Sequence, residues 1–329
     1  MKIFDTRWIG PHGIGRFASE LYGRLPGFQG IELGGRPASP IDPWRLAGYL
    51  SARKPELFLS PGYNAPAGRG HRFGLTVHDL NHLRVPANSN LPKRLYYRTV
   101  MRPALHRAKI VLTVSEFSRS EICNWAGVAE SRVVNVGNGI SAEFEADGPK
   151  HVGPDSRPYL LYVGNYKPHK NFERLLRAFV RTRAMRECGL LCTGRSPASM
   201  SRLIAELGLG GRVDFTGEIS DARLATLYRG AIALVCVSTY EGFGLPTIEA
   251  MACGTPVIAS NAAAIPEVTG GAAVLVDPLD IDSIANAIDR VAEDEELRET
   301  LRTLGLSRAR QFSWDVTAAK VLSAISACV

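Results

Sequence analysis

Residues 232–260 read "IALVCVSTYEGFGLPTIEAMACGTPVIAS". The apolar run 232–238 has the composition of a buried strand, the run 245–254 that of an apolar helix, and 256–260 that of a second strand. The proline at position 246 suits the first turn of the helix, where a missing N–H costs nothing. This order predicts two parallel strands joined by a helix.

The same alternation continues outward on both sides of this stretch. Strands are expected at 57–60, 74–79, 110–115, 159–165, 190–194 and 213–217, and helices at 14–25, 91–108, 170–184, 199–209 and 221–231. Strands that alternate with helices form parallel sheets covered by helices on both faces. The sequence therefore predicts an α/β protein of two Rossmann-like, doubly wound domains that face each other across a cleft, with the ligand at the carboxyl ends of the strands.

The length of 329 residues exceeds what one hydrophobic core usually serves, which favours two domains. Between the halves, "EADGPKHVGPDSRP" (145–158) combines glycine, proline and charge without periodicity, as a linker does. We therefore expect domains at 1–150 and 156–312.

Composition narrows the class of protein. The chain is 45% hydrophobic and 22% charged, which is typical of a globular protein. It has no uninterrupted apolar run of the roughly 18 to 20 residues that span a membrane, and its start has no apolar signal region. These features predict a cytoplasmic protein.

Positive charge is concentrated in the first half of the chain. Residues 1–155 hold 20 Lys and Arg against 13 Asp and Glu, whereas the remainder holds 19 of each. No acid lies between Asp79 and Glu116, where Arg94, Arg98 and Arg102 recur every fourth residue and would share one helix face. Such a face suits phospholipid headgroups at the inner membrane face or a phosphate-bearing acceptor, although a solvated face has the same pattern. No nucleic-acid partner is expected, because no recognition motif accompanies these residues.

The loop before the helix at 245 has the chemistry of a phosphate site. The loop comprises Glu241, Gly242, Phe243 and Gly244, and the helix begins at about Leu245. A glycine loop that leads into a helix presents backbone N–H groups at the positive end of the helix dipole, which favours a diphosphate. Glu249, one turn into the helix, is expected to accept hydroxyls, and Glu241 to reach a group beyond the diphosphate. The pattern predicts a nucleotide diphosphate that carries a polyhydroxylated group.

The segment "EGFGLPTIEAMACGTPVIAS" resembles the Glu-x7-Glu motif of the retaining, mannosyltransferase-like glycosyltransferases of family 4, which have the two-domain GT-B fold. Further segments that resemble this family cover nearly the whole chain: "GPHGIGRFASEL", "TVHDL", "VLTVSEFSRSEI", "VGNGI", "YVGNYKPHKNFERLLRAF" and "FSWDVTAAKVL". The last resembles the family's closing helix, so residues 313–329 are expected to return to the first domain.

The resemblance implies a role for individual residues. Glu249 would bind the ribose, Glu241 a hydroxyl of the transferred sugar, and Lys170 the diphosphate. The implied catalytic residues are thus His78, which would face the sugar, with Glu241 and Lys170. The implied donor site also includes Gly13 and Gly15 of the glycine-rich loop, backbone groups at Gly242, Phe243, Gly244 and Leu245, and Ile219, which would pack on the base. Asn165 and His169 depart from the family, which often has arginine there; Lys167 could substitute.

The implied reaction moves a hexose from a nucleotide sugar, GDP-mannose before UDP-sugars, to a hydroxyl of a polysaccharide or lipid-linked glycan, with retention. The leaving diphosphate would help to deprotonate that hydroxyl, so the reaction needs no cofactor. Asp280 and Asp282 resemble a metal-binding pair, but Asp282 directly precedes a helix and is interpreted as its N-cap, so no metal is expected. The alternatives are a sugar-nucleotide epimerase, a glycan phosphorylase and a non-catalytic nucleotide binder.

Overall fold

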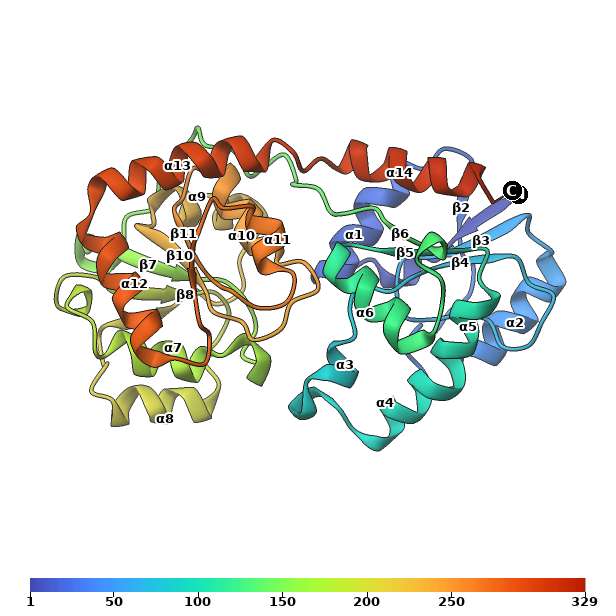
Figure 1. Ribbon diagram of the computed structural model, residues 1–329, viewed down its shortest axis with the longest axis horizontal. Coiled ribbons are helices and arrows are strands. Elements are labelled where there is room, and N and C mark those ends of the chain that lie inside the picture. Colours follow the sequence, from blue (N-terminus) through green and yellow to red (C-terminus); the bar gives the residue numbers. More distant parts are fainter. Residues whose placement is uncertain (329) are drawn as a thin grey trace. The chain divides into compact units, whose positions relative to one another are not determined.

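The computed structural model of the protein describes residues 1–328, and Figure 1 shows its elements. The chain forms two compact units, the first made of Met1–Gly139 and the chain from Ser313 onward, the second of Ile140–Phe312. Each unit is built on a six-stranded sheet in which every strand pair is parallel. The predicted α/β class with two parallel sheets is confirmed.

The first unit has the strand order β2-β1-β3-β4-β5-β6. Its strands are β1 (Lys2–Phe4), β2 (Phe28–Gly30), β3 (Leu57–Ser60), β4 (Phe73–Thr76), β5 (Ile110–Thr113) and β6 (Val133–Asn135). Its helices include α1 (Gly13–Tyr22), α2 (Asp42–Arg53), α3 (Asn81–Arg84), α6 (Glu116–Ala126) and α14 (Trp314–Ser326). The central strands β3, β4 and β5 are buried along their whole length, which is why they read as continuous apolar runs.

The second unit has the strand order β12-β11-β10-β7-β8-β9. Its strands are β7 (Tyr159–Tyr162), β8 (Gly189–Cys192), β9 (Val213–Phe215), β10 (Ala233–Cys236), β11 (Val257–Ser260) and β12 (Val274–Val276). Its helices are α7 (Phe172–Phe179), α8 (Ala198–Glu206), α9 (Asp221–Gly230), α10 (Leu245–Ala252), α11 (Ile265–Thr269), α12 (Ile281–Glu293) and α13 (Glu295–Ala309). In the stretch quoted first, β10 and β11 pair in parallel with Leu234 opposite Val257, as predicted.

The basic helix expected at 91–108 is not one regular α-helix. It comprises α4 (Leu91–Tyr96), a π-helical turn at Tyr97–Met101 and α5 (Arg102–Arg107). The N–H of Arg102 bonds to the carbonyl of Tyr97, five residues back. Pro103 follows directly and has no N–H to continue the regular ladder, which accounts for the wider turn at this point.

The segment expected as a linker, 145–158, belongs to the second unit, because the two units divide at residues 139 and 140 rather than near 150. Phe144 is 4% exposed and packs edge-on against the Tyr228 ring, with 5.9 Å between centroids. Farther along, the N–H of His151 donates to the Thr226 carbonyl at 2.9 Å. Glycine, proline and charge predicted a linker here, but long-range contacts hold the segment against α9.

The chain returns to the first unit through α14, which packs against α1. Trp314 is 2% exposed at the start of this helix. Gly139 lies against it so closely that an added Cβ would be 2.2 Å from the Trp314 nitrogen, and therefore only glycine fits. Residue 329, the last of the expected closing helix, lies outside the described residues.

Candidate active site

Two predicted site residues meet at the carboxyl edge of the second unit's sheet. Strands β7 and β10 are neighbours, so the loops that follow them lie side by side. Lys170 ends a short 3₁₀ helix after β7, and Glu241 lies in the loop after β10. The Lys170 Nζ is 2.6 Å from the Glu241 Oε1, and the two side chains are 16% and 13% exposed. A positive and a negative group are thus held together in a partly desolvated position.

The environment keeps Glu241 ionised. Burial alone would raise the pKa of its carboxyl, but the charge and hydrogen bond of Lys170, helped by a hydrogen bond from Ser238, outweigh burial and lower that pKa below its ordinary value. An ionised carboxylate only accepts hydrogen bonds, so Glu241 suits a sugar hydroxyl.

The turn from the loop into α10 depends on glycine. Gly244 has a φ of +96° and caps α10 without a side-chain hydrogen bond, and an added Cβ would be 2.4 Å from the Ile265 Cδ1. Pro246 occupies the first turn. Helix N–H groups without a side-chain cap favour an anion, so this end of α10 fits a diphosphate. Phe243 is buried and packs edge-on against Phe312, with 5.6 Å between centroids, which anchors the loop.

The second carboxylate of the motif is deeply buried in α10. Glu249 is 3% exposed, and the Tyr228 hydroxyl donates to its Oε2 at 3.0 Å. Tyr228 lies on α9, 21 residues earlier in the chain, and no spacing in the sequence indicated this contact. The hydrogen bond fixes the orientation of the carboxylate that is expected to hold the ribose.

In the first unit, His78 follows β4 and is 9% exposed. Its Nε2 is 2.8 Å from the Pro61 carbonyl, which can only accept, so Nε2 carries the proton. Burial lowers the pKa of His78 and outweighs the hydrogen bond to Pro61 and the charge of Asp79, which raise it. The imidazole is therefore neutral near pH 7, with Nδ1 as its accepting nitrogen.

The glycines near α1 have different tasks. The His12 Nδ1 caps α1 by accepting from the Gly15 N–H at 2.9 Å. A Cβ on Gly15 would be 2.1 Å from the Gly10 oxygen, so close backbone packing requires this glycine. The Gly15 N–H is thus engaged inside the protein, and the assignment of Gly15 to the donor site stays a prediction. Gly13 begins α1.

The other predicted donor-site residue, Ile219, and the residues that depart from the family pattern occupy varied positions. Ile219 lies between β9 and α9 and packs, half-buried, against the core. The Asn165 carbonyl accepts from the Tyr162 hydroxyl at 2.8 Å. His169 is 7% exposed, and its carbonyl accepts from the Thr239 N–H at 2.7 Å. Both residues shape the loop around Lys170, while Lys167 is exposed.

The three arginines of the basic helix are exposed. The Arg94 Nε donates to the Ser89 Oγ at 2.9 Å, and the Arg102 Nε to the Ala126 carbonyl at 3.3 Å. On the same helix, Leu91 and Leu95 are 79% and 56% exposed. Within residues 1–328, no helix is long and apolar enough to cross a membrane.

The structure corrects the interpretation of the aspartate pair. Asp280, not Asp282, caps α12, because its side chain accepts from the Asp282 N–H at 2.9 Å. Asp282 lies in the first turn and forms an ion pair with Arg181 at 2.8 Å. In the described part of the chain, no group of three or more His, Cys, Asp and Glu side chains could hold a metal ion.

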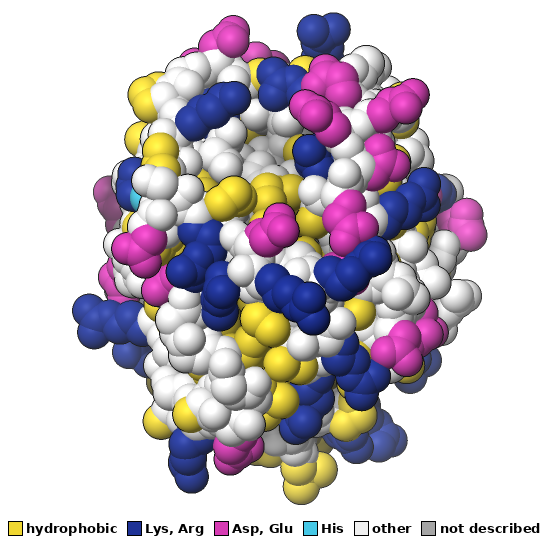
Figure 2. All heavy atoms as spheres, turned by 90° about the vertical axis from the view of Figure 1, so that its left-hand side faces the viewer, with side chains coloured by type: hydrophobic (Ala, Val, Ile, Leu, Met, Phe, Trp, Pro, Cys, Tyr) yellow, Lys and Arg dark blue, Asp and Glu magenta, His cyan; other side chains and the backbone are white. Residues whose placement is uncertain are grey.

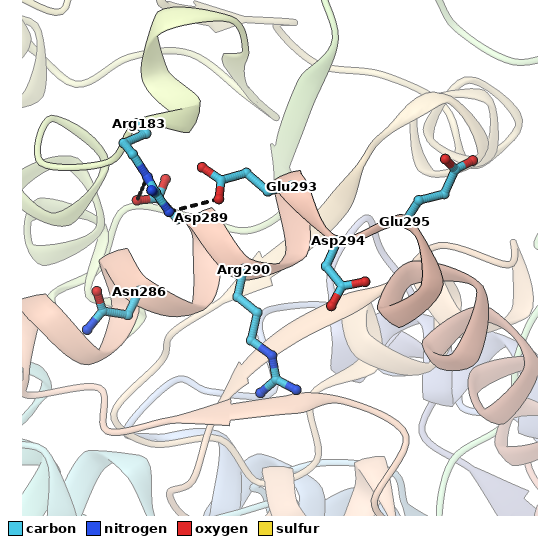
Figure 3. A pocket seen from close by; sticks show the side chains of 7 residues that line it. All are labelled: Arg183, Asn286, Asp289, Arg290, Glu293, Asp294 and Glu295. Atoms are coloured by element: carbon cyan, nitrogen blue, oxygen red, sulfur yellow. Dashed lines mark hydrogen bonds and ion pairs between the residues drawn. The ribbon is translucent and has the colours of Figure 1, made fainter.

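A hollow of about 600 Å³ in the second unit lies elsewhere (Figure 3). It is lined by Arg183, Asn286, Asp289, Arg290, Glu293, Asp294 and Glu295. Arg183 precedes β8 and Glu293 ends α12, so the hollow lies toward the amino edge of the sheet, opposite Glu241. Ion pairs from Arg183 to Asp289 (3.7 Å) and Glu293 (2.8 Å) neutralise part of its charge. Figure 2 shows a face of this unit on which basic and acidic side chains both occur.

Comparison with known proteins identifies the family. Residues 4–144 match the family described as Glycosyltransferase Family 4, and residues 143–306 match Glycosyl transferases group 1. The chain is 32% identical to O-antigen chain mannosyltransferase B of Escherichia coli over 86% of this chain and 77% of that protein. It is 31% identical to O-antigen chain mannosyltransferase RfbU of Salmonella typhimurium over 67% of this chain and 60% of that protein. It spans only 28% of the serotype-specific mannosyltransferase WbdA of Escherichia coli.

Solved structures agree on the fold. Sucrose-phosphate synthase from Thermosynechococcus elongatus matches with a TM-score of 0.77 at 23% identity, covering 99% of this chain and 98% of that one. WaaG, a glycosyltransferase involved in lipopolysaccharide biosynthesis, matches with a TM-score of 0.73 at 15% identity, covering 98% of both chains. These likenesses confirm the GT-B fold class. The chain belongs to family 4 of the glycosyltransferases.

Proposed function

We propose that this glycosyltransferase moves mannose from GDP-mannose to a hydroxyl of a growing polysaccharide or lipid-linked glycan, with retention and without a metal. The contact between Lys170 and Glu241 carries the proposal, because it joins the groups that would hold the diphosphate and the sugar. The names of the relatives, which are O-antigen mannosyltransferases, favour mannose. UDP-sugars are the second choice of donor.

Donor binding would use groups that the protein already orients. Glu249, held by Tyr228, would accept hydrogen bonds from the ribose. The Lys170 ammonium would turn from Glu241 toward the diphosphate beside the start of α10, and the freed Glu241 carboxylate would accept a sugar hydroxyl. Because the cation and the helix N-terminus are in place before the bond breaks, they would stabilise the charge that develops on the leaving diphosphate.

The acceptor hydroxyl would attack the anomeric carbon as the bond to the diphosphate breaks. An oxygen of the leaving diphosphate would take its proton on the same face of the sugar, which preserves the anomeric configuration. His78 is neutral and its Nε2 is engaged with Pro61, so its Nδ1 would accept a hydrogen bond from the sugar rather than supply charge. The positive charge would come from Lys170, so the reaction would need no metal.

The basic helix is where we place contact with a membrane that carries the acceptor. Exposed arginines next to exposed leucines are typical of helices that lie on anionic membranes. On this assignment the protein works in the cytoplasm, peripheral to the inner face of the plasma membrane.

Donor hydrolysis and thermal protection test the function. The protein would be incubated separately with GDP-mannose, UDP-glucose, UDP-GlcNAc and UDP-galactose, with and without chelator, next to Glu249→Ala. We expect GDP-mannose alone to raise the Tm and to release GDP, chelator to have no effect, and Glu249→Ala to lose both responses. Release of UDP from a UDP-sugar would mean that this sugar is the donor. Loss of diphosphate release in the presence of chelator would overturn the metal-free mechanism. If no donor raises the Tm or releases its diphosphate, the proposed site is contradicted.

A further inference from the structure

A buried polar network lies at the carboxyl edge of the first unit's sheet. Asp5 follows β1, Arg7 lies in the 3₁₀ helix after it, Asp42 opens α2, and Asn64 lies in the loop after β3. The Arg7 Nη2 is 2.7 Å from the Asp5 Oδ2, and the Arg7 Nη1 is 2.7 Å from the Asp42 Oδ1. The Asn64 Nδ2 donates to the same carboxylates at 2.8 and 3.1 Å. Asp5, Asp42 and Asn64 are fully buried, and the Arg7 side chain is 8% exposed.

Burying the charges of this network costs free energy that an apolar core would not cost. Burial alone would lower the pKa of Arg7, but hydrogen bonds and charge from Asp5 and Asp42 raise it, so the guanidinium stays protonated. Removing charges from water costs more than packing apolar side chains of the same volume, and buried ion pairs therefore add little to stability. Their better-supported use is to fix one geometry.

The geometry that the network fixes is that of the loop 60–64. The Asn64 Oδ1 accepts from the Ser60 Oγ at 2.5 Å and from the Trp8 Nε1 at 2.7 Å. Gly62 packs against the Trp8 ring so closely that an added Cβ would be 2.4 Å from a ring atom. The two ends of the loop are therefore bonded to each other, and Trp8 contacts both its middle and its end.

This loop in turn holds the histidine motif. The Pro61 carbonyl accepts from the His78 Nε2 at 2.8 Å. The Tyr63 hydroxyl donates to the Asp79 Oδ1 and accepts from the Asp79 N–H, each at 3.0 Å. A shift of the loop would move the partner that decides which ring nitrogen of His78 carries the proton.

We propose that Arg7, Asp42 and Asn64 are positioning residues for His78. They act through the Pro61 carbonyl, which keeps the proton on Nε2 and leaves Nδ1 to accept from the substrate. The structural part of this inference concerns the tautomer alone, and its catalytic consequence rests on the proposed function.

The test is the tautomer of His78 in Asn64→Ala. This variant removes four hydrogen bonds of the network and leaves both Arg7 ion pairs in place. The ring nitrogens of the 15N-histidine-labelled protein would be observed by NMR, with His78→Gln to assign the signal among the seven histidines. We expect a single Nε2-protonated form in the wild type and a mixture of tautomers in the variant. If the proposed transfer is measurable, we expect kcat to fall about 10- to 100-fold while KM for the donor stays within about threefold.

Two controls separate positioning from loss of stability. Asn88→Ala makes the same substitution in the same unit at a residue that bonds to Asn81 instead. Val133→Ala removes part of a side chain of β6 that is 2% exposed, and so lowers stability away from the network. Both should keep the wild-type signals of His78. If Asn64→Ala lowers the Tm but keeps a single tautomer and its kcat, the network is only structural and the proposal is wrong.

The two arms of the test also separate this proposal from the proposed function. If the wild type transfers no sugar but Asn64→Ala shows a mixture of tautomers, the positioning of His78 is supported and the proposed function is overturned. Should Asn64→Ala fail to fold, Ser60→Ala is the second variant. It removes the bond to the Asn64 Oδ1 and the bonds of the Ser60 Oγ to the Gly62 carbonyl and N–H, and it must still shift the tautomer for the proposal to stand.

Discussion

The Tyr228 hydroxyl donates a hydrogen bond to the Glu249 carboxylate at 3.0 Å. Tyr228→Phe keeps the ring and removes this donor, leaving a buried carboxylate less well held. Since hydrogen bonds to charged groups are worth about 1.5 to 3 kcal/mol, we expect KM for the donor to rise about tenfold or more, with kcat within about twofold. Steady-state kinetics with the donor that the hydrolysis assay selects would measure both constants.

Tyr159→Phe is the matched control for that prediction. Its hydroxyl is also buried in the second unit and donates to the Leu227 carbonyl at 2.8 Å, so the same atom is lost without touching Glu249. The role of Tyr228 is contradicted if both variants change KM equally, or if neither does.

At the scale of elements, the basic helix yields a prediction about membranes. An arginine near an anionic surface contributes about 1 kcal/mol, so replacing Arg94, Arg98 and Arg102 with alanine should weaken binding to phosphatidylserine vesicles about 100-fold. Neutral vesicles should bind wild type and variant equally weakly. Vesicle co-sedimentation at fixed ionic strength would measure this.

A triple variant in the second unit separates this helix from general charge. Replacing Arg177, Arg181 and Arg183 with alanine removes the same net charge from a unit that holds as many acids as bases beyond residue 155. We expect its vesicle binding to stay near the wild-type value. An equal loss in both triple variants would mean that net charge, not the helix, drives binding.

The elements themselves show what a sequence can predict. The buried strand β3 ends where its apolar run ends, because both faces of a central parallel strand are covered. The strand expected at 159–165 ends at Tyr162. The prediction was too long because the apolar Val163 continues the sequence pattern past the last residue that pairs with a neighbouring strand. The meeting of Lys170 and Glu241 depends on the pairing of β7 with β10, and strand order leaves no mark in local sequence.

The contacts that escaped sequence reasoning share one property. Tyr228 reaches Glu249 from another helix, and Asn64 reaches Asp5 across 59 residues. No periodicity or spacing connects such partners, because folding alone brings them together. Motifs could therefore single out the residues proposed for catalysis, whereas the residues that hold them in place could not be found from the sequence.

At the scale of the whole molecule, the return of the chain to the first unit depends on Gly139. A Cβ there would be 2.2 Å from the Trp314 nitrogen and 2.7 Å from the Ser313 carbonyl carbon, both backbone atoms that cannot turn aside. Overpacking of this kind costs about 1 to 3 kcal/mol. In a unit of this size, we expect Gly139→Ala to lower the Tm by roughly 3 to 10 °C and to make α14 sensitive to proteases.

Calorimetry and limited proteolysis of the full chain would test that prediction, with Gly48→Ala as the control. Gly48 lies within α2, and a Cβ there meets no atom within 4 Å, so alanine should be neutral or slightly stabilising. Early cleavage after Phe312 in Gly139→Ala, absent from Gly48→Ala, would locate the damage at the docking of α14. A wild-type Tm in Gly139→Ala would mean that the backbone near Trp314 yields at little cost, and that the close approach is not what holds the closing helix in place.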